Sequence, residues 1–251
     1  MRTVIALRHH GVHEGSLLGI GTDTDAKGAA DVVAVGMRRK LFSAVAAQLG
    51  HPHGPLSRVV AVALNRGNRP ATCAAVELSV AAPGQTVADI GFGGGLGLSL
   101  LLGRVGDDGV VYGIELSREM LDRARSRNSR EQGAGRLRLV HGTLTASGLE
   151  DRSLDAAITV NTLYFVADLD SACRELVRVM RPGGRLVVGV GDPDAMAQLP
   201  FTRYGFILRP VAEVTAALRN AGFDLLAQRT LDEITVPHHL LVAIRSDAIP
   251  L

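Results

Sequence analysis

The sequence predicts an α/β protein in which helices cover both faces of a mostly parallel, doubly wound sheet. Three observations lead to this prediction. After Ala82, short apolar segments alternate with helical patterns, which is typical of βαβ units. The first apolar segment ends at Asp89 and continues into a glycine cluster at 91–97. Hydrophobic residues make up 47% of the 251 residues and charged residues 21%, a balance that favours one well-packed core over disorder.

Seven apolar segments are expected to form strands. They are 86–90, 110–115, 136–142, 153–160, 185–190, 223–229 and 239–245. The helix LGLSLLLGRV follows the glycine cluster directly, so the first strand, turn and helix form one unit.

Local start and stop signals justify the other helices. Ser117 and Asp168 are expected to cap the helices that follow them, because their side chains accept from free N–H groups of a first turn. Pro182-Gly183-Gly184 is expected to end the helix that Asp168 begins. Gly222 is expected to end the helix at 211–222.

The N-terminal third has a different character. Residues 1–36 show weak periodicity and are interpreted as a poorly ordered extension, with an irregular cover as the alternative. Residues 37–82 read as three short helices: one ended by HPHGP at 51–55, one at 56–66, and one at 71–80 with Pro70 at its start. Three helices ahead of a sheet suggest a lid over a substrate, or a surface through which two copies form a homodimer.

Composition narrows the classes of function. The formal net charge is +2, there is no Trp, and aromatic residues make up 4%, which disfavours a nucleic-acid stacking platform. No secretory signal and no apolar run of about 18 residues is present, so we expect no membrane span and a cytoplasmic location. Cys73 and Cys173 are expected to be two buried free thiols.

The glycine cluster carries the strongest functional signal. Gly91, Gly93 and Gly95 alternate after the first strand, so the backbone can turn sharply and approach a ligand without a Cβ in the way. Glu115 ends the second strand, 24 residues after Gly91, near the position where an acid accepts hydrogen bonds from ribose hydroxyls. Together the two features favour a nucleoside-type ligand over a tight turn without a ligand. A dinucleotide is disfavoured, because Leu96 stands where the dinucleotide pattern requires the third glycine.

The segment from Asp89 to Gly97 resembles motif I of class I S-adenosylmethionine-dependent methyltransferases. VYGIELSREMLDRAR resembles the second strand and helix of that family, and the stretch 153–189, with RVMRPGGRL, resembles the fourth strand through the fifth. The resemblance covers roughly 83–245 and includes the ubiquinone/menaquinone C-methyltransferases among many small-molecule enzymes. It divides the chain into an extension (1–36), a helical lid (37–82) and an S-adenosylmethionine-binding domain (83–251).

The resemblance implies a Rossmann-like seven-stranded sheet of order 3-2-1-4-5-7-6 with an antiparallel seventh strand. It also implies a set of roles: the glycines and Phe92 in the cofactor-binding turn, Glu115 on the ribose diol, and Leu116 against adenine. Asp89 would either orient the turn or reach the methionine ammonium. Many members carry Asp after the third strand, but this chain has Thr143, so adenine recognition would rest more on backbone groups and Leu144. Asn161 and Leu163, just past the fourth strand, would line the methyl-transfer space.

The catalytic groups stay open at this point. Methyl transfer needs alignment and exclusion of water, and it needs a base only when the acceptor must lose a proton. Weak candidates for a catalytic role are Tyr164, Asn161, His141, His238 and His239. Arg203 and Tyr204 fall where the family often has a substrate loop. No metal-ligand spacing is present. The alternatives to a small-molecule methyltransferase are a repurposed cofactor-binding module and a nicotinamide-dependent oxidoreductase.

Overall fold

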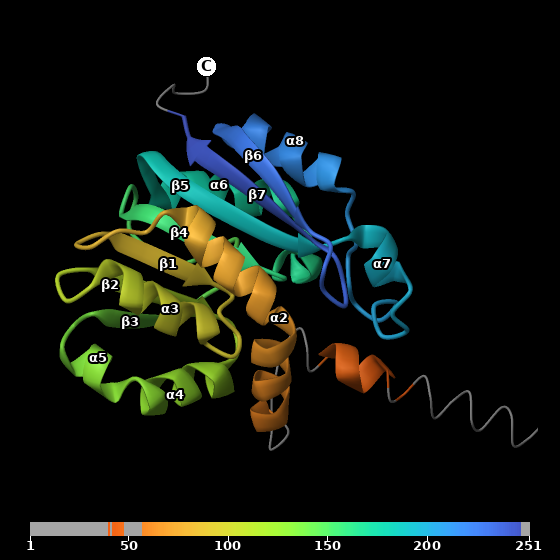
Figure 1. The fold of residues 1–251 in the computed structure, drawn as a ribbon, viewed down its shortest axis with the longest axis horizontal. Helices are drawn as coiled ribbons and strands as arrows, with labels where there is room; N and C mark the ends of the chain where they lie inside the picture. The colour runs from red at the N-terminus through yellow and green to blue at the C-terminus, as the bar shows by residue number, and fades with distance from the viewer. Residues whose placement is uncertain (1–39, 41, 48–56, 247–251) are drawn as a thin grey trace, which may run out of the picture. The chain divides into compact units, whose positions relative to one another are not determined.

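A computed structural model describes residues 40, 42–47 and 57–246 of the chain. Two units are distinguished, Met1–Leu41 and Phe42–Leu251. Of the first unit only Lys40 is described, so the extension expected at 1–36 lies outside the described residues. In the second unit, residues 42–47 are helical, and a continuous α/β fold begins at residue 57 (Figure 1).

The sheet has seven strands in the order β3-β2-β1-β4-β5-β7-β6, as expected. The strands are β1 (Thr86–Ile90), β2 (Val110–Glu115), β3 (Leu137–His141), β4 (Leu154–Val160), β5 (Met180–Gly191), β6 (Phe223–Leu231) and β7 (His238–Arg245). Strands β1 to β5 pair in parallel, and β7 pairs antiparallel with both β5 and β6. The order reverses between β1 and β4, and that switch point opens a crevice at the carboxyl ends of the strands.

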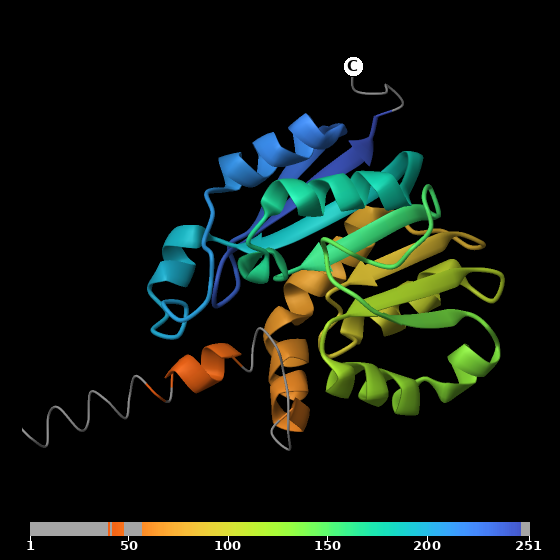
Figure 2. The ribbon, with the colours of Figure 1, turned by 180° about the vertical axis from the view of Figure 1, so that it is seen from behind.

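Helices cover both faces of this sheet. They are α2 (Ser57–Ser79), α3 (Leu96–Val105), α4 (Arg118–Arg127), α5 (Ser129–Gly133), α6 (Leu169–Val179), α7 (Pro193–Ala197) and α8 (Val211–Ala221), with a 3-10 turn η1 (Leu163–Phe165) after β4. Figure 1 shows α2 and α3 in front of the sheet, and Figure 2, from behind, shows α6 and α8 on the opposite face.

Two apolar clusters form the core, one on each face. The first packs side chains of α6 and α8, such as Leu176 and Leu218, against β4 and β5. The second packs α2, α3 and α4, including Leu98, Leu101 and Met120, against β1 and β2. Burial of apolar area on both faces is the dominant stabilising contribution in such a sheet.

The predicted caps agree with the structure. Ser117 accepts from the Met120 N–H at 3.4 Å, and Asp168 accepts from the Ser171 N–H at 2.9 Å. Gly222 ends α8 with a left-handed φ of 112°. These signals act within one turn of the chain, which explains why the sequence alone reveals them.

Three local expectations were wrong. The helices predicted at 56–66 and 71–80 are one helix, α2, with Pro70 inside it. The glycines at 183 and 184 lie within β5, because α6 already ends at Val179 and the chain is extended from Met180. Cys173 is buried as predicted, but Cys73 is only partly buried, on α2.

Candidate functional site

A cavity of about 1140 Å³ lies at the carboxyl ends of β1 to β4. Its wall is built by the turns that follow these strands, by the middle of α2, by the segment around α7, and by the β6–β7 connection. A drug-sized ligand ordinarily occupies a pocket of about 300–1,000 Å³. The cavity can therefore hold two small molecules side by side.

The turn between β1 and α3 forms the floor at one end. Gly91, Gly93 and Gly95 have φ of 77°, 49° and 81°, a left-handed conformation that side chains disfavour. A Cβ at Gly91 would overlap the hydroxyl of Thr162, and a Cβ at Gly97 would overlap the carboxylate of Asp89. The bare backbone is thus required both by the conformation and by close neighbours.

Glu115 at the end of β2 connects this turn to the next helix. Its carboxylate accepts from the Gly93 N–H at 2.9 Å and from the Ser117 N–H at 2.9 Å. The side chain is buried but lines the cavity. A carboxylate offers about four acceptor positions, so two remain for a ligand.

Asp89 at the end of β1 is buried beside Glu115. Burial, and next the charge of Glu115, raise the pKa of Asp89 from its usual 3.8 to about 8. The group is therefore largely protonated at neutral pH. A cation placed next to it would favour the charged form and lower its pKa.

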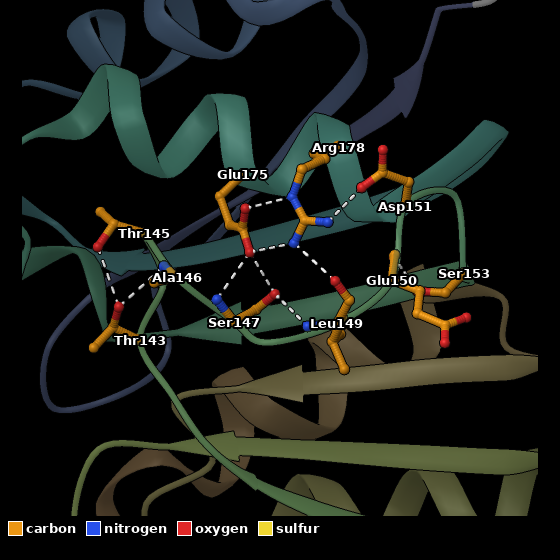
Figure 3. A network of polar contacts seen from close by, with 10 residues as sticks. All are labelled: Thr143, Thr145, Ala146, Ser147, Leu149, Glu150, Asp151, Ser153, Glu175 and Arg178. Carbon is orange, nitrogen blue, oxygen red and sulfur yellow. Dashed lines mark hydrogen bonds and ion pairs between the residues drawn. The ribbon is translucent and has the colours of Figure 1, made fainter.

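A polar network fixes the segment between β3 and β4, which carries Thr143 and Leu144 into the cavity wall (Figure 3). Glu175 on α6 accepts from the Ser147 N–H at 2.8 Å and from its hydroxyl at 2.5 Å. Arg178 donates to Glu175 at 2.8 Å and to the carbonyl of Leu149 at 2.8 Å. Arg178 also pairs with Asp151 at 2.5 Å. Helix α6, on the face of the sheet opposite α2 and α3, thus determines the position of one wall of the cavity.

A second polar network lies where β4 ends. Asn161 has a left-handed φ of 59°, a strained conformation that clusters at functional sites. Its amide donates to Asn68 of α2 at 3.0 Å and lies 3.0 Å from His238 Nε2, while its oxygen accepts from the Tyr164 hydroxyl at 3.1 Å. Three elements distant in sequence therefore meet at Asn161.

The protonation states in this network follow from its partners. His238 Nδ1 lies 2.7 Å from the carbonyl of Val236, which can only accept, so Nδ1 carries the proton and Nε2 is an acceptor. Burial lowers the pKa of His238. Burial raises the pKa of Tyr164 to about 12, although the Gly191 N–H donates to its oxygen. Tyr164 is therefore a phenol that orients Asn161, and His238 is a neutral imidazole.

The far end of the cavity is apolar. The rings of Tyr164 and Phe206 lie 5.5 Å apart, those of Phe165 and Phe206 4.7 Å apart, and those of Phe201 and Phe206 5.8 Å apart. Centroid separations of this size are favourable between aromatic rings. Met196 and Leu199 line the same end. The cavity thus has a polar end under the glycine turn and an aromatic end near α7.

The structure brings most of the predicted residues together. The following predicted residues line the cavity: Asp89, Gly91, Phe92, Gly93, Glu115, Leu116, Thr143, Leu144, Asn161, Tyr164 and His238. The following do not line it: Gly95, His141, Leu163, Arg203, Tyr204 and His239. Gly95 begins α3, and His141 is an exposed residue whose ring lies 2.9 Å from the Leu116 carbonyl. His239 pairs with Asp192 at 3.0 Å.

Sequence reasoning missed several residues of the wall. They are Arg66, Asn68 and Thr72 on α2, and Phe201 and Phe206 between α7 and α8. The sequence did contain a signal for the two phenylalanines, because they flank Arg203 and Tyr204 in the segment where a substrate loop was expected. For α2 the sequence predicted a lid over the substrate, but no local signal indicated which of its residues line the cavity. Among the described residues, no cluster of three or more His, Cys, Asp or Glu side chains is arranged to hold a metal ion.

Comparison with known proteins agrees with this geometry. A family model described as a methyltransferase domain matches residues 88–188. The ubiquinone/menaquinone biosynthesis C-methyltransferase UbiE of Legionella pneumophila is 35% identical over 155 residues, 61% of this chain and 62% of that protein. The O-methyltransferase cnsE of Penicillium expansum is 30% identical over 151 residues, 58% of this chain and 54% of that protein. The chain thus spans little more than half the length of these curated relatives.

A solved structure has a similar fold. Geranyl diphosphate C-methyltransferase from Streptomyces coelicolor A3(2), in complex with Mg²⁺, geranyl diphosphate and S-adenosyl-L-homocysteine, gives a TM-score of 0.62 at 18% identity, covering 79% of this chain and 89% of that one. At this identity the likeness concerns the fold alone. The family match places a methyltransferase domain at residues 88–188, and the strand order is the one expected from the resemblance to class I S-adenosylmethionine-dependent methyltransferases.

Proposed function

We propose that this protein binds S-adenosylmethionine at the polar end of its cavity and transfers the methyl group to a small-molecule acceptor at the aromatic end. One observation carries the proposal: the Glu115 carboxylate and the bare backbone at Gly93 meet at 2.9 Å on the cavity wall. Glycines without Cβ atoms leave room for a ligand, and Glu115 keeps acceptor positions for a ribose diol.

The residues present fit the cofactor's chemistry. The bound cofactor supplies an electrophilic methyl group on a sulfonium. Asp89 offers a buried carboxyl to the ammonium of the amino-acid portion, and its raised pKa falls when a cation approaches. Leu116 and Leu144 offer apolar contact to adenine, and Thr143 offers a hydroxyl, which already accepts from the Ala146 N–H at 3.1 Å.

The aromatic end supports the acceptor. Phe165, Phe201 and Phe206 give the second half of the cavity an apolar wall, which suits an apolar acceptor aligned with the cofactor for an in-line displacement. Asn161 lies between the two ends, held by Tyr164 and Asn68. Where the acceptor must lose a proton, His238 Nε2 is the acceptor group nearest this position in the network.

Residues 37–82 act as the lid in this proposal. The described part of that segment supports the role, because Arg66, Asn68 and Thr72 of α2 line the cavity. We also propose that this segment pairs two copies of the chain, which light scattering on the purified protein would test directly. Among the described helices, none has the length and apolar character needed to cross a bilayer.

Calorimetric titration tests the cofactor assignment. We expect S-adenosylmethionine and S-adenosylhomocysteine to bind and NAD not to bind. Glu115→Ala should weaken binding on the order of tenfold to a hundredfold, because it removes charge-assisted hydrogen bonds. Glu77→Gln, at an exposed glutamate that does not line the cavity, is the matched control and should bind normally.

Two results would contradict the proposal. Unchanged affinity in the Glu115→Ala protein would remove the ribose assignment, and tighter binding of NAD would favour the oxidoreductase. A screen of small acceptors with a labelled methyl donor then separates an enzyme from a module that binds the cofactor without transfer. Label in no acceptor of a broad O-, N- and C-nucleophile panel would favour the module.

A further inference from the structure

The middle of α2 presents a cation to the wall of the cavity. Five residues of this helix line the wall: Arg66, Gly67, Asn68, Pro70 and Thr72. Helical side chains three and four positions apart share a face, so Arg66 and Pro70 lie one above the other. The neighbouring Arg69 does not line the cavity.

The charges of the cavity wall are unequal. Its described carboxyl groups belong to Asp89, Glu115, Asp168, Asp232 and Glu233, whereas Arg66 is its one described Lys or Arg side chain. His238 is neutral for the reasons given above. The guanidinium of Arg66 is exposed and forms no salt bridge with any described residue. A carboxylate entering this cavity therefore finds its complementary charge at Arg66.

Pro70 changes the hydrogen bonding of the Arg66 backbone, which is a second, independent feature of Arg66. In a helix the carbonyl of Arg66 would accept from the N–H of the residue four positions later, but Pro70 has no N–H. The backbone oxygen of Arg66 is thus left without its usual donor. One residue therefore offers both a cationic side chain and an acceptor oxygen, the pair of groups that complements an amino acid's carboxylate and ammonium.

The position of this segment is fixed by the site itself. Asn68, two residues after Arg66, accepts from the Asn161 amide at 3.0 Å, and Asn161 follows β4 at the switch point. Farther along α2, Ala74, Ala75 and Val76 are buried in the core cluster that also includes β1 and α3. The helix is therefore fixed on both sides of Pro70.

We propose that Arg66 binds the carboxylate of the amino-acid portion of S-adenosylmethionine, so that α2 closes the cofactor site. The inference rests on the proposed function and extends it to a residue outside the glycine turn. Guanidinium groups bind carboxylates through two parallel hydrogen bonds, a geometry that Lys does not reproduce.

Two probes that differ only in the amino-acid portion test the proposal. S-adenosylhomocysteine carries the carboxylate and the ammonium, and 5′-methylthioadenosine keeps the adenosine and the thioether but lacks both. In calorimetry, Arg66→Ala should weaken S-adenosylhomocysteine binding on the order of tenfold and leave 5′-methylthioadenosine binding unchanged. Arg66→Lys should recover part of the loss, since it keeps the charge but not the planar fork.

Arg69→Ala is the matched control, because it removes an exposed arginine from the same helix outside the cavity. The loss in Arg66→Ala should also shrink at high salt, as expected for a partly exposed ion pair. Equal losses for the two probes, no loss for either, or an equal loss in Arg69→Ala would overturn the role of Arg66. Failure of the unaltered protein to bind either probe would instead refute the proposed cofactor itself.

Discussion

The network around Glu175 gives a stability prediction with a definite sign and size. Burial alone would raise the pKa of Glu175, but hydrogen bonds from Arg178 and Ser147 more than offset it and lower the pKa from 4.5 to about 2. One pKa unit corresponds to about 1.4 kcal/mol, so the full shift amounts to about 3 kcal/mol. Arg178 is 37% exposed, and solvent screening reduces the expected contribution to about 2 kcal/mol.

The pH dependence follows from the direction of the shift. The pKa of Glu175 is lower in the folded state than in the unfolded state, so its contribution is complete above about pH 4.5 and is lost as the pH falls toward 2. Glu175→Gln should therefore lower the free energy of unfolding by about 2 kcal/mol at pH 7. The difference between the two proteins should shrink steadily below pH 4.5.

Urea unfolding followed by circular dichroism, repeated between pH 7 and pH 3, measures both quantities. Asp170→Asn is the control, because it neutralises an exposed carboxylate on the same helix. The reasoning is refuted if Glu175→Gln is as stable as the unaltered protein at pH 7. It is equally refuted if the two proteins lose stability in parallel below pH 4.5.

The remaining predictions concern the polar end of the cavity. Gly97→Ala should destabilise the protein by about 1–3 kcal/mol in urea unfolding, because its Cβ would overlap the Asp89 carboxylate. Gly103→Ala is the control on the same helix; its Cβ would enter open space, so this change should be neutral or slightly stabilising. A stable Gly97→Ala protein would contradict the close packing. Affinity for S-adenosylmethionine should rise as the pH increases toward about 8, and binding should release a proton, because a cation favours ionised Asp89. Calorimetry in buffers of different ionisation enthalpy detects this proton. An Asp89→Asn protein should release no proton from this position.

The parts of the fold that the sequence predicts correctly are those set by neighbouring residues. Ser117, Asp168 and Gly222 act within one turn, and the glycines at 91, 93 and 95 permit the left-handed backbone that the sharp turn requires. The strand order followed from the family resemblance, since spacing alone does not specify which strands pair.

The continuity of α2 depends on contacts that local sequence does not reveal. A proline inside a helix costs about 3 kcal/mol, which is why Pro70 suggested a helix start. The helix continues because Ala74, Ala75 and Val76 are buried against the sheet and α3. Packing outweighs the local cost at this position, and it brings Arg66 and Asn68 to the site.

The histidines also show that local sequence alone does not reveal which side chains reach the cavity. His141 is the last residue of β3 at the expected edge, but its ring lies against the Leu116 carbonyl and does not line the cavity. His238 begins β7, which runs antiparallel, so its first residue pairs with Gly191 at the carboxyl end of β5. The expected antiparallel direction of the seventh strand already predicted this position, because the first residue of an antiparallel strand lies at the end of the sheet where the parallel strands finish.

The strands that α2 contacts limit the order in which parts of the molecule can fold during synthesis. The helix precedes every strand that the structure describes, yet its contacts include β4, β5 and β7, which are synthesised much later. A nascent chain therefore carries the part of α2 that packs on β5 and β7 without those partners until more than a hundred further residues have been added, although α3 follows it directly. The wall that bears Arg66 is consequently among the last parts to reach its final place, and a chain released before β5 would have the glycine turn but not the closed site.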